Sequence, residues 1–161
     1  KRVIGLPGDK VRLIKGKLFI NESMLIREEL SDFIEKKMEQ GSMKTVPQCV
    51  NEPVPFGNEN CIKYQSLEKL DNGKSYKILD LGQNIGDDTQ DFIIGDNEYF
   101  FLGDNRDNSL DSRFDRQFGG VGLVSKEYLI GKASLILFSS RGSSIFYFWT
   151  WRKDRFFKVI R

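Results

Sequence analysis

The chain has 161 residues, a net charge of +2 and no histidine, which excludes a Ser-His-Asp or Cys-His catalytic arrangement within it and removes the commonest metal ligand. Two cysteines are too few for a Cys₄ zinc site or an iron–sulfur cluster, and the small net charge gives no indication of nucleic-acid binding. Hydrophobic residues at 39% and charged residues at 30% are typical of a globular protein. Because the chain has no histidine, any acid–base chemistry must use Lys, Asp, Glu or Tyr.

The first part of the chain is dominated by strand-like segments. The runs 11–14 and 18–20 flank Lys15-Gly16-Lys17 and predict a β-hairpin. In front of them, Gly5-Leu6-Pro7-Gly8-Asp9 predicts a fixed turn, because glycine tolerates a positive φ and proline presets its own. The charged run 28–40 has apolar residues at helical spacing, which predicts a short helix or a solvated loop.

The middle of the chain is the least regular part. The segments 62–70 and 75–79 flank Asp71-Asn72-Gly73 and predict a hairpin with a primed turn. Residues 82–91 are polar and are predicted to form a loop. The continuous apolar run 99–102 predicts a buried strand, and 133–138 is a further strand candidate.

The C-terminal segment, 143–161, is rich in aromatic and basic residues, with seven aromatic residues between Phe146 and Phe157. Ser143 or Ser144 could cap a helix there. One interpretation is a segment that rests on a lipid surface, because Trp, Tyr and Phe suit the headgroup region and Lys and Arg favour anionic lipid. The other is an ordinary terminal helix packed on the core. The number of aromatic residues favours the first interpretation.

Two motifs carry the strongest chemical signal. One is Lys1-Arg2-Val3-Ile4-Gly5-Leu6-Pro7-Gly8-Asp9, and the other is Gly103-Asp104-Asn105-Arg106-Asp107-Asn108-Ser109-Leu110-Asp111-Ser112-Arg113. In the second, carboxylates alternate with arginines, which favours a rigid turn held by ion pairs. A calcium loop is disfavoured, because the arginines supply the positive charge that the cation would bring. From composition alone, a structural turn is the better interpretation.

Both motifs, in this order, resemble signature boxes of the bacterial type I signal peptidases. The resemblance covers most of the chain, with a variable middle of about residues 29–90, and it continues in Gly119-Gly120-Val121-Gly122 and Leu129-Ile130-Gly131-Lys132-Ala133. It implies a mostly β fold of antiparallel sheets with short helices and an inserted β subdomain. Residues 1–161 would form the C-terminal part of the extracytoplasmic domain. It also implies a serine endopeptidase with a Ser–Lys dyad and no cofactor or metal, acting at the outer, periplasmic face of the cytoplasmic membrane.

The resemblance assigns a role to each matching residue. Lys1 falls on the general base, which must be neutral to take a proton, and burial against apolar groups favours that neutral form. Ser109 falls on the serine that orients this lysine rather than on the nucleophile. Four charged residues fall on positions that support the site: Arg2, Asp104, Asp111 and Arg113.

The chain also departs from the family pattern. The nucleophile box, a Ser-Met-x-Pro-like motif, and the membrane anchor both lie upstream of the lysine in these enzymes. Ser23-Met24 follows the lysine and lacks the proline, so the nucleophile role is not moved onto it. The chain is therefore expected to be inactive alone.

Other expectations follow from the implied location. Outside the cytoplasm a disulfide between Cys49 and Cys61 is favoured over two free thiols. The expected partners are preproteins that carry signal peptides and the lipid surface, the latter through Phe146, Trp149 and Trp151. Two alternatives are a self-cleaving repressor-type Ser–Lys protease, which would lack the 103–113 box, and a non-catalytic extracytoplasmic β domain that binds peptide or membrane.

Overall fold

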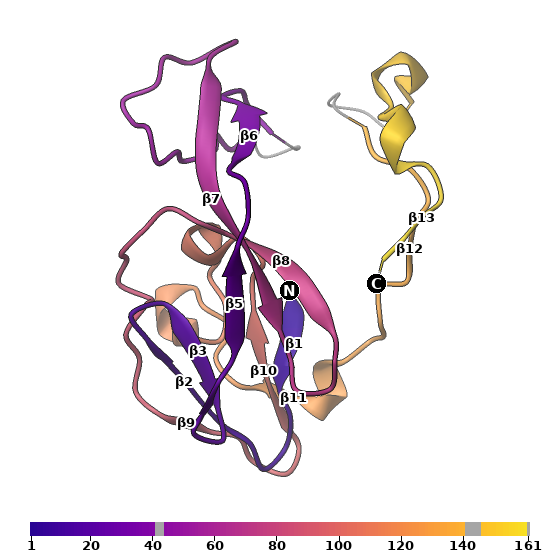
Figure 1. Cartoon of the computed structure of the whole chain (residues 1–161). Helices are drawn as coiled ribbons and strands as arrows, with labels where there is room; N and C mark the ends of the chain where they lie inside the picture. Colours follow the sequence, from indigo (N-terminus) through magenta and orange to yellow (C-terminus); the bar gives the residue numbers. More distant parts are fainter. Residues whose placement is uncertain (41–43, 141–145, 161) are drawn as a thin grey trace.

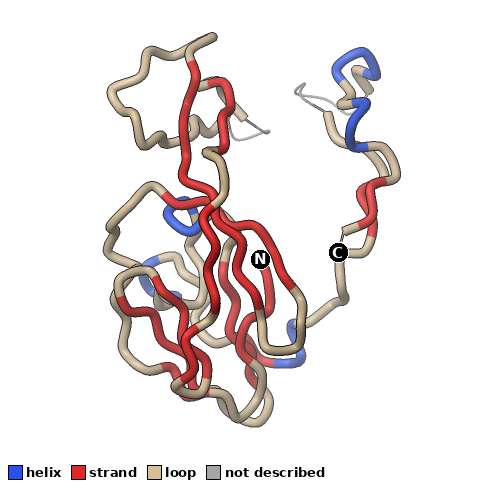
Figure 2. The backbone as a smooth tube through the Cα atoms, in the orientation of Figure 1, coloured by secondary structure: helices blue, strands red, loops and turns tan. Residues whose placement is uncertain are grey.

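The computed structural model describes residues 1–40, 44–140 and 146–160, and antiparallel β-sheets dominate these residues (Figures 1 and 2). The helical segments of this part are 3-10 turns of three residues each. The predicted mostly β, antiparallel fold is confirmed. Within the same residues, no helix is long and apolar enough to cross a membrane.

The first sheet joins the start of the chain to its second half. Strand β1 (Arg2–Gly5) pairs antiparallel with β10 (Glu98–Leu102), which also pairs with β11 (Val124–Ser125). In this register Arg2 lies opposite Leu102. The pairing therefore places Lys1 beside the segment that follows β10, where the second sequence motif begins.

A second sheet contains the predicted N-terminal hairpin. Its order is β4 (Ser23–Met24), β3 (Lys17–Ile20), β2 (Lys10–Ile14) and β9 (Phe92–Ile93). The prediction of a hairpin is confirmed, and its turn takes positive φ angles at Lys15 and Gly16. Alternate side chains of β2 and β3 are buried because a strand points them to opposite faces. These side chains join the core, whose buried members are Ile4, Val11, Leu13, Leu18, Leu25, Tyr76, Ile78, Ile94, Phe100 and Leu102.

The third sheet replaces the expected helix or loop at 28–40. Strands β5 (Ile26–Glu29) and β6 (Phe33–Lys36) both pair with the ten-residue strand β7 (Asn60–Lys69), so that prediction is wrong. The helical spacing was misleading because its apolar residues do not form a buried stripe: Ile34 is 57% exposed and Met38 is 48% exposed. Hydrogen bonding to β7 decides the local structure instead.

The predicted hairpin in the middle of the chain is confirmed, since β7 pairs with β8 (Ser75–Asp80). Its turn differs from the primed type. The Gly73 N–H donates to the Leu70 carbonyl at 2.9 Å, and Gly73 takes the positive φ of 78°. This is a three-residue loop that ends in a left-handed glycine.

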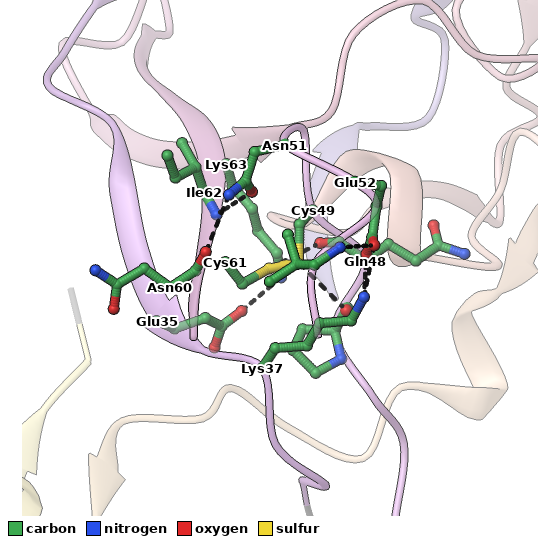
Figure 3. The surroundings of a disulfide bond; sticks show 12 residues. Glu35, Lys37, Gln48, Cys49, Asn51, Glu52, Asn60, Cys61, Ile62 and Lys63 are labelled. Carbon is green, nitrogen blue, oxygen red and sulfur yellow. Dashed lines mark hydrogen bonds and ion pairs between the residues drawn. A yellow bond between two sulfur atoms is a disulfide. The ribbon is translucent and has the colours of Figure 1, made fainter. Parts of the chain in front are cut away.

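The two cysteines form the disulfide favoured from the sequence, with an S–S distance of 2.08 Å (Figure 3). Cys61 lies on β7, so the bond ties this strand to the loop that carries Cys49. Beside it, Lys63 on the same strand is buried and forms an ion pair with Glu35 of β6 at 2.7 Å. These elements form a lobe at one end of β7, away from the first sheet in Figure 1.

The end of the chain forms a hairpin arm rather than a helix packed on the core. Strands β12 (Leu135–Ile136) and β13 (Lys158–Val159) pair antiparallel, and the turns η4 (Phe148–Thr150) and η5 (Lys153–Arg155) lie between them. The strand candidate 133–138 is thus reduced to two residues. The proposed helix caps, Ser143 and Ser144, lie outside the described residues. Figure 1 shows the arm extending away from the three sheets.

Candidate active site

The structure brings Lys1 and Ser109 together. Lys1 precedes β1, and Ser109 follows the 3-10 turn η1 (Arg106–Asn108) after β10. The Lys1 Nζ donates a hydrogen bond to Ser109 Oγ at 2.9 Å, across 108 positions of sequence. Lys1 is exposed in the described chain, whereas Ser109 is half-buried. An amine beside a hydroxyl is the geometry that a lysine base and an orienting serine require.

Gly103 makes room for the Ser109 side chain. A Cβ at position 103 would lie 2.2 Å from Ser109 Oγ and 2.4 Å from Ser109 Cβ, so any larger residue would displace the serine. Gly103 also donates its backbone N–H to Asp111 Oδ2 at 3.0 Å. The glycine that opens the motif therefore has a steric reason to be there.

Arg2 and Asp104 form the first supporting ion pair. The Arg2 guanidinium donates to both carboxylate oxygens, at 3.0 and 2.9 Å. This bidentate pair joins the first residue of β1, which directly follows Lys1, to the second residue after β10. The hydrogen bond to Asp104 raises the pKa of Arg2 against the effect of its partial burial.

Asp111 and Arg113 form the second pair, which is buried. Asp111 Oδ1 accepts from Arg113 Nε at 2.8 Å, and Asp111 Oδ2 accepts from Arg113 Nη2 at 3.0 Å. Burial alone would raise the pKa of Asp111, but the hydrogen bonds from Arg113 and Gly103 lower it below its usual value. The four supporting residues thus form two separate pairs, one on each side of Ser109 in the sequence.

A third group of charged residues was not predicted from the sequence. Arg106 donates to both carboxylate oxygens of Glu68, and the Tyr76 hydroxyl donates to Glu68 Oε2 at 2.9 Å. Burial disfavours the charged form of Arg106, but Glu68 raises the pKa of Arg106 above its ordinary value. The pKa of Tyr76 is raised mainly by burial and also by the negative charge of Glu68. The sequence held one signal for this group: side chains alternate between the two faces of a strand, and this alternation places Glu68 on the buried face of β7.

A cavity of about 500 Å³ opens at Lys1 and Ser109. Asp107 lies on its wall, accepting from the Leu81 N–H at 2.5 Å, and burial raises the pKa of this carboxyl. The part of the chain that the structure describes brings no three Cys, Asp or Glu side chains together as a metal-binding group. The lining residues are Lys1, Asn84, Ile85, Gly86, Arg106, Asp107, Asn108, Ser109, Leu110, Arg113 and Phe114.

Comparison of the sequence with known proteins shows the family of the chain. A family model described as signal peptidase, peptidase S26, matches residues 1–138. The chain is 36% identical over 149 residues to signal peptidase I of Rickettsia typhi, which covers 88% of this chain and 46% of that protein. Signal peptidase I of Rickettsia bellii is 36% identical over 148 residues, covering 88% of this chain and 42% of the relative.

A third relative, signal peptidase I of Rickettsia prowazekii, is 34% identical over 149 residues, and again 46% of the relative is covered. The chain therefore spans less than half the length of these relatives. The matched residues, 1–138, include both sequence motifs. The chain belongs to the signal peptidase family, peptidase S26.

Proposed function

We propose that this chain is the base-carrying part of a signal peptidase I, which removes N-terminal signal peptides from exported preproteins. The observation that carries the proposal is the hydrogen bond of 2.9 Å from Lys1 Nζ to Ser109 Oγ in a chain of this family. With no histidine in the sequence, lysine is the residue available to act as the base beside a serine.

In the proposed mechanism, neutral Lys1 takes the proton from a nucleophilic serine, whose oxygen attacks the scissile carbonyl. The amine then gives this proton to the leaving amino group as the peptide bond breaks, and an acyl-enzyme is left. Lys1 next removes a proton from water, whose oxygen attacks the ester, and gives this proton to the serine oxygen as the ester bond breaks, which regenerates both the serine and the neutral amine. The nucleophile would come from a serine upstream of Lys1 in the full-length protein, as the family pattern implies.

Ser109 would hold the Lys1 amine in the direction of the nucleophile. Arg2 and Asp104 would fix the backbone on the lysine side, while Asp111 and Arg113 would fix it on the serine side. Lys1 is exposed in this chain, so the apolar cover that favours a neutral amine would come from the preceding segment and the bound preprotein. The proposed place of action is the outer face of the cytoplasmic membrane.

The test is a cleavage assay with the full-length gene product, a preprotein and the matching mature protein as a size marker. We expect cleavage at the signal-peptide junction by the full-length protein and none by the 161-residue chain. Binding of the preprotein without cleavage by the full-length protein would instead favour a non-catalytic binding domain. Cleavage by the isolated chain would contradict the assignment of the nucleophile to an upstream serine.

We further propose that the C-terminal arm contacts an anionic lipid surface. Its exposed aromatic side chains include Phe146, Phe148 and Trp149, which are 82%, 69% and 68% exposed. Trp151 is less exposed than these three, because its ring stacks on Phe138 with centroids 4.7 Å apart and also contacts Phe156. Residues 146–160 carry four basic residues and one acidic residue, so their charge complements anionic headgroups.

Replacing Phe146, Phe148 and Trp149 with serine is expected to weaken binding of the chain to phosphatidylglycerol vesicles about tenfold or more, because these rings supply the apolar contact. Co-sedimentation with vesicles measures the change, and neutral phosphatidylcholine vesicles measure the contribution of charge. The control carries serine at Phe56, Ile93 and Phe118, which are equally exposed elsewhere. Equal losses in both variants, or no loss, would exclude the arm as the contact.

A further inference from the structure

We propose that Glu68 and Tyr76, on the β7–β8 hairpin, are positioning residues that set the geometry of the Lys1–Ser109 pair. This inference rests on the proposed function. Neither residue belongs to the two sequence motifs, and neither contacts Lys1 or Ser109 through a hydrogen bond that the structure describes. Each acts through an arginine that does belong to a motif.

On the serine side, Glu68 fixes the start of the turn that carries Ser109. Its side chain is 1% exposed, and that of Arg106 is 3% exposed. The two Arg106 Nη groups donate separately to the two Glu68 oxygens, which fixes the orientation of the guanidinium plane. Since Arg106 opens the 3-10 turn that ends immediately before Ser109, this pair sets where the turn begins.

On the lysine side, Tyr76 supports the residue next to Lys1. The Arg2 guanidinium carbon lies 4.2 Å from the centre of the Tyr76 ring, and the Tyr76 hydroxyl donates to Glu68. Glu68 therefore connects the two arginines of the site. It binds Arg106 directly and reaches Arg2 through Tyr76. The backbone strengthens this connection, because Leu79 N–H of β8 donates to the Asp104 carbonyl at 2.7 Å.

The arrangement points to positioning because an ion pair is an inefficient way to stabilise a core. Desolvation of both charges offsets most of their attraction, and an apolar pair of similar volume often gives equal stability. A bidentate pair, however, sets direction as well as distance, and small displacements of a catalytic group have large effects on rate. Glu68 therefore serves the geometry of the site more than the stability of the fold.

The same strand offers a matched control. Lys63 of β7 forms another ion pair, with Glu35 of β6, and the two side chains are 4% and 20% exposed. Lys63 precedes Glu68 by five residues, which is about 16 Å along an extended strand, and it faces the disulfide lobe in Figure 3. Breaking this pair should disturb β7 without moving Ser109.

The experiment is a double-mutant cycle in kcat/KM for preprotein cleavage by the full-length gene product. We expect Glu68→Gln to lower kcat about tenfold, with KM little changed. In a Ser109→Ala background the same substitution should cost less than about twofold, because the group that Glu68 positions is gone. Glu35→Gln should have less than about a twofold effect in either background.

Equal losses from Glu68→Gln with and without Ser109 would overturn the inference and leave Glu68 a structural residue. If Glu68→Gln does not fold, Tyr76→Phe takes its place, since it keeps the ring beneath Arg2 and removes only the hydroxyl. Absence of cleavage by the unmodified protein would refute the proposed function itself, so the two failures are distinguishable.

Discussion

Replacing Lys1 with methionine in the full-length protein is expected to lower kcat for preprotein cleavage at least about a thousandfold. Methionine keeps an unbranched side chain of similar length but cannot take a proton from the nucleophile or return one to the leaving amine. The fold should persist, because the exposed Lys1 side chain has Ser109 as its hydrogen-bond partner here and packs into no part of the core. Steady-state cleavage and thermal unfolding, measured on the same preparation, test both parts.

Lys17→Met is the matched control for this prediction. Lys17 is also exposed and begins β3, in a different sheet from β1, so its loss removes an equal charge without touching Ser109. Its cleavage rate should match that of the unmodified protein within about twofold. If the Lys1→Met variant still processes preprotein at the normal rate, Lys1 is not the general base, and the family assignment is unaffected.

The part of the site that could be predicted from the sequence is the part encoded by local motifs. Gly103 to Arg113 contains its own partners, such as Asp111 and Arg113, and the alternation of charges indicated a turn held by ion pairs. The meeting of Lys1 with Ser109 depends on β1 pairing with β10, which no local pattern indicates. It was expected only because the two motifs together resemble those of a known family.

The failures have a common physical cause. The run 28–40 has helical periodicity, but β7 offers it a ladder of backbone hydrogen bonds, and the tertiary partner overrides the local preference. Glu68 was missed for the same reason, since its importance depends on Arg106, 38 residues away. Trp151 was predicted to contact lipid together with Phe146 and Trp149, because composition does not distinguish a half-buried ring stacked on Phe138 from an exposed one.

Replacing Asp111 with alanine is expected to lower the free energy of unfolding by about 3–5 kcal/mol, because it leaves a buried charge without its partner. The Arg113 side chain is 1% exposed and that of Asp111 is fully buried. The substitution also leaves the Gly103 N–H without its acceptor, next to Ser109. Urea unfolding at neutral pH measures the loss. A change below about 1 kcal/mol would mean that Arg113 finds another partner or water.

The pH dependence of this contribution should carry the sign of a lowered pKa. The native pKa of Asp111 lies below its ordinary value of 3.8, so its ionised form stabilises the fold above about pH 4 and loses this effect as the pH falls through the native pKa. The free energy of unfolding of the unmodified chain minus that of Asp111→Asn should therefore decrease as the pH falls from about 7 to about 3.

Asp107→Asn is the matched control on the same loop, because burial raises the pKa of Asp107. Its contribution has the opposite sign: it is fully present below about pH 4 and is lost as the pH rises through the native pKa. The free energy of unfolding of the unmodified chain minus that of Asp107→Asn should therefore increase as the pH falls through the native pKa. Parallel pH profiles for the two variants would show that the two carboxyls do not experience opposite environments, and would contradict a pKa of Asp111 that Arg113 and Gly103 lower.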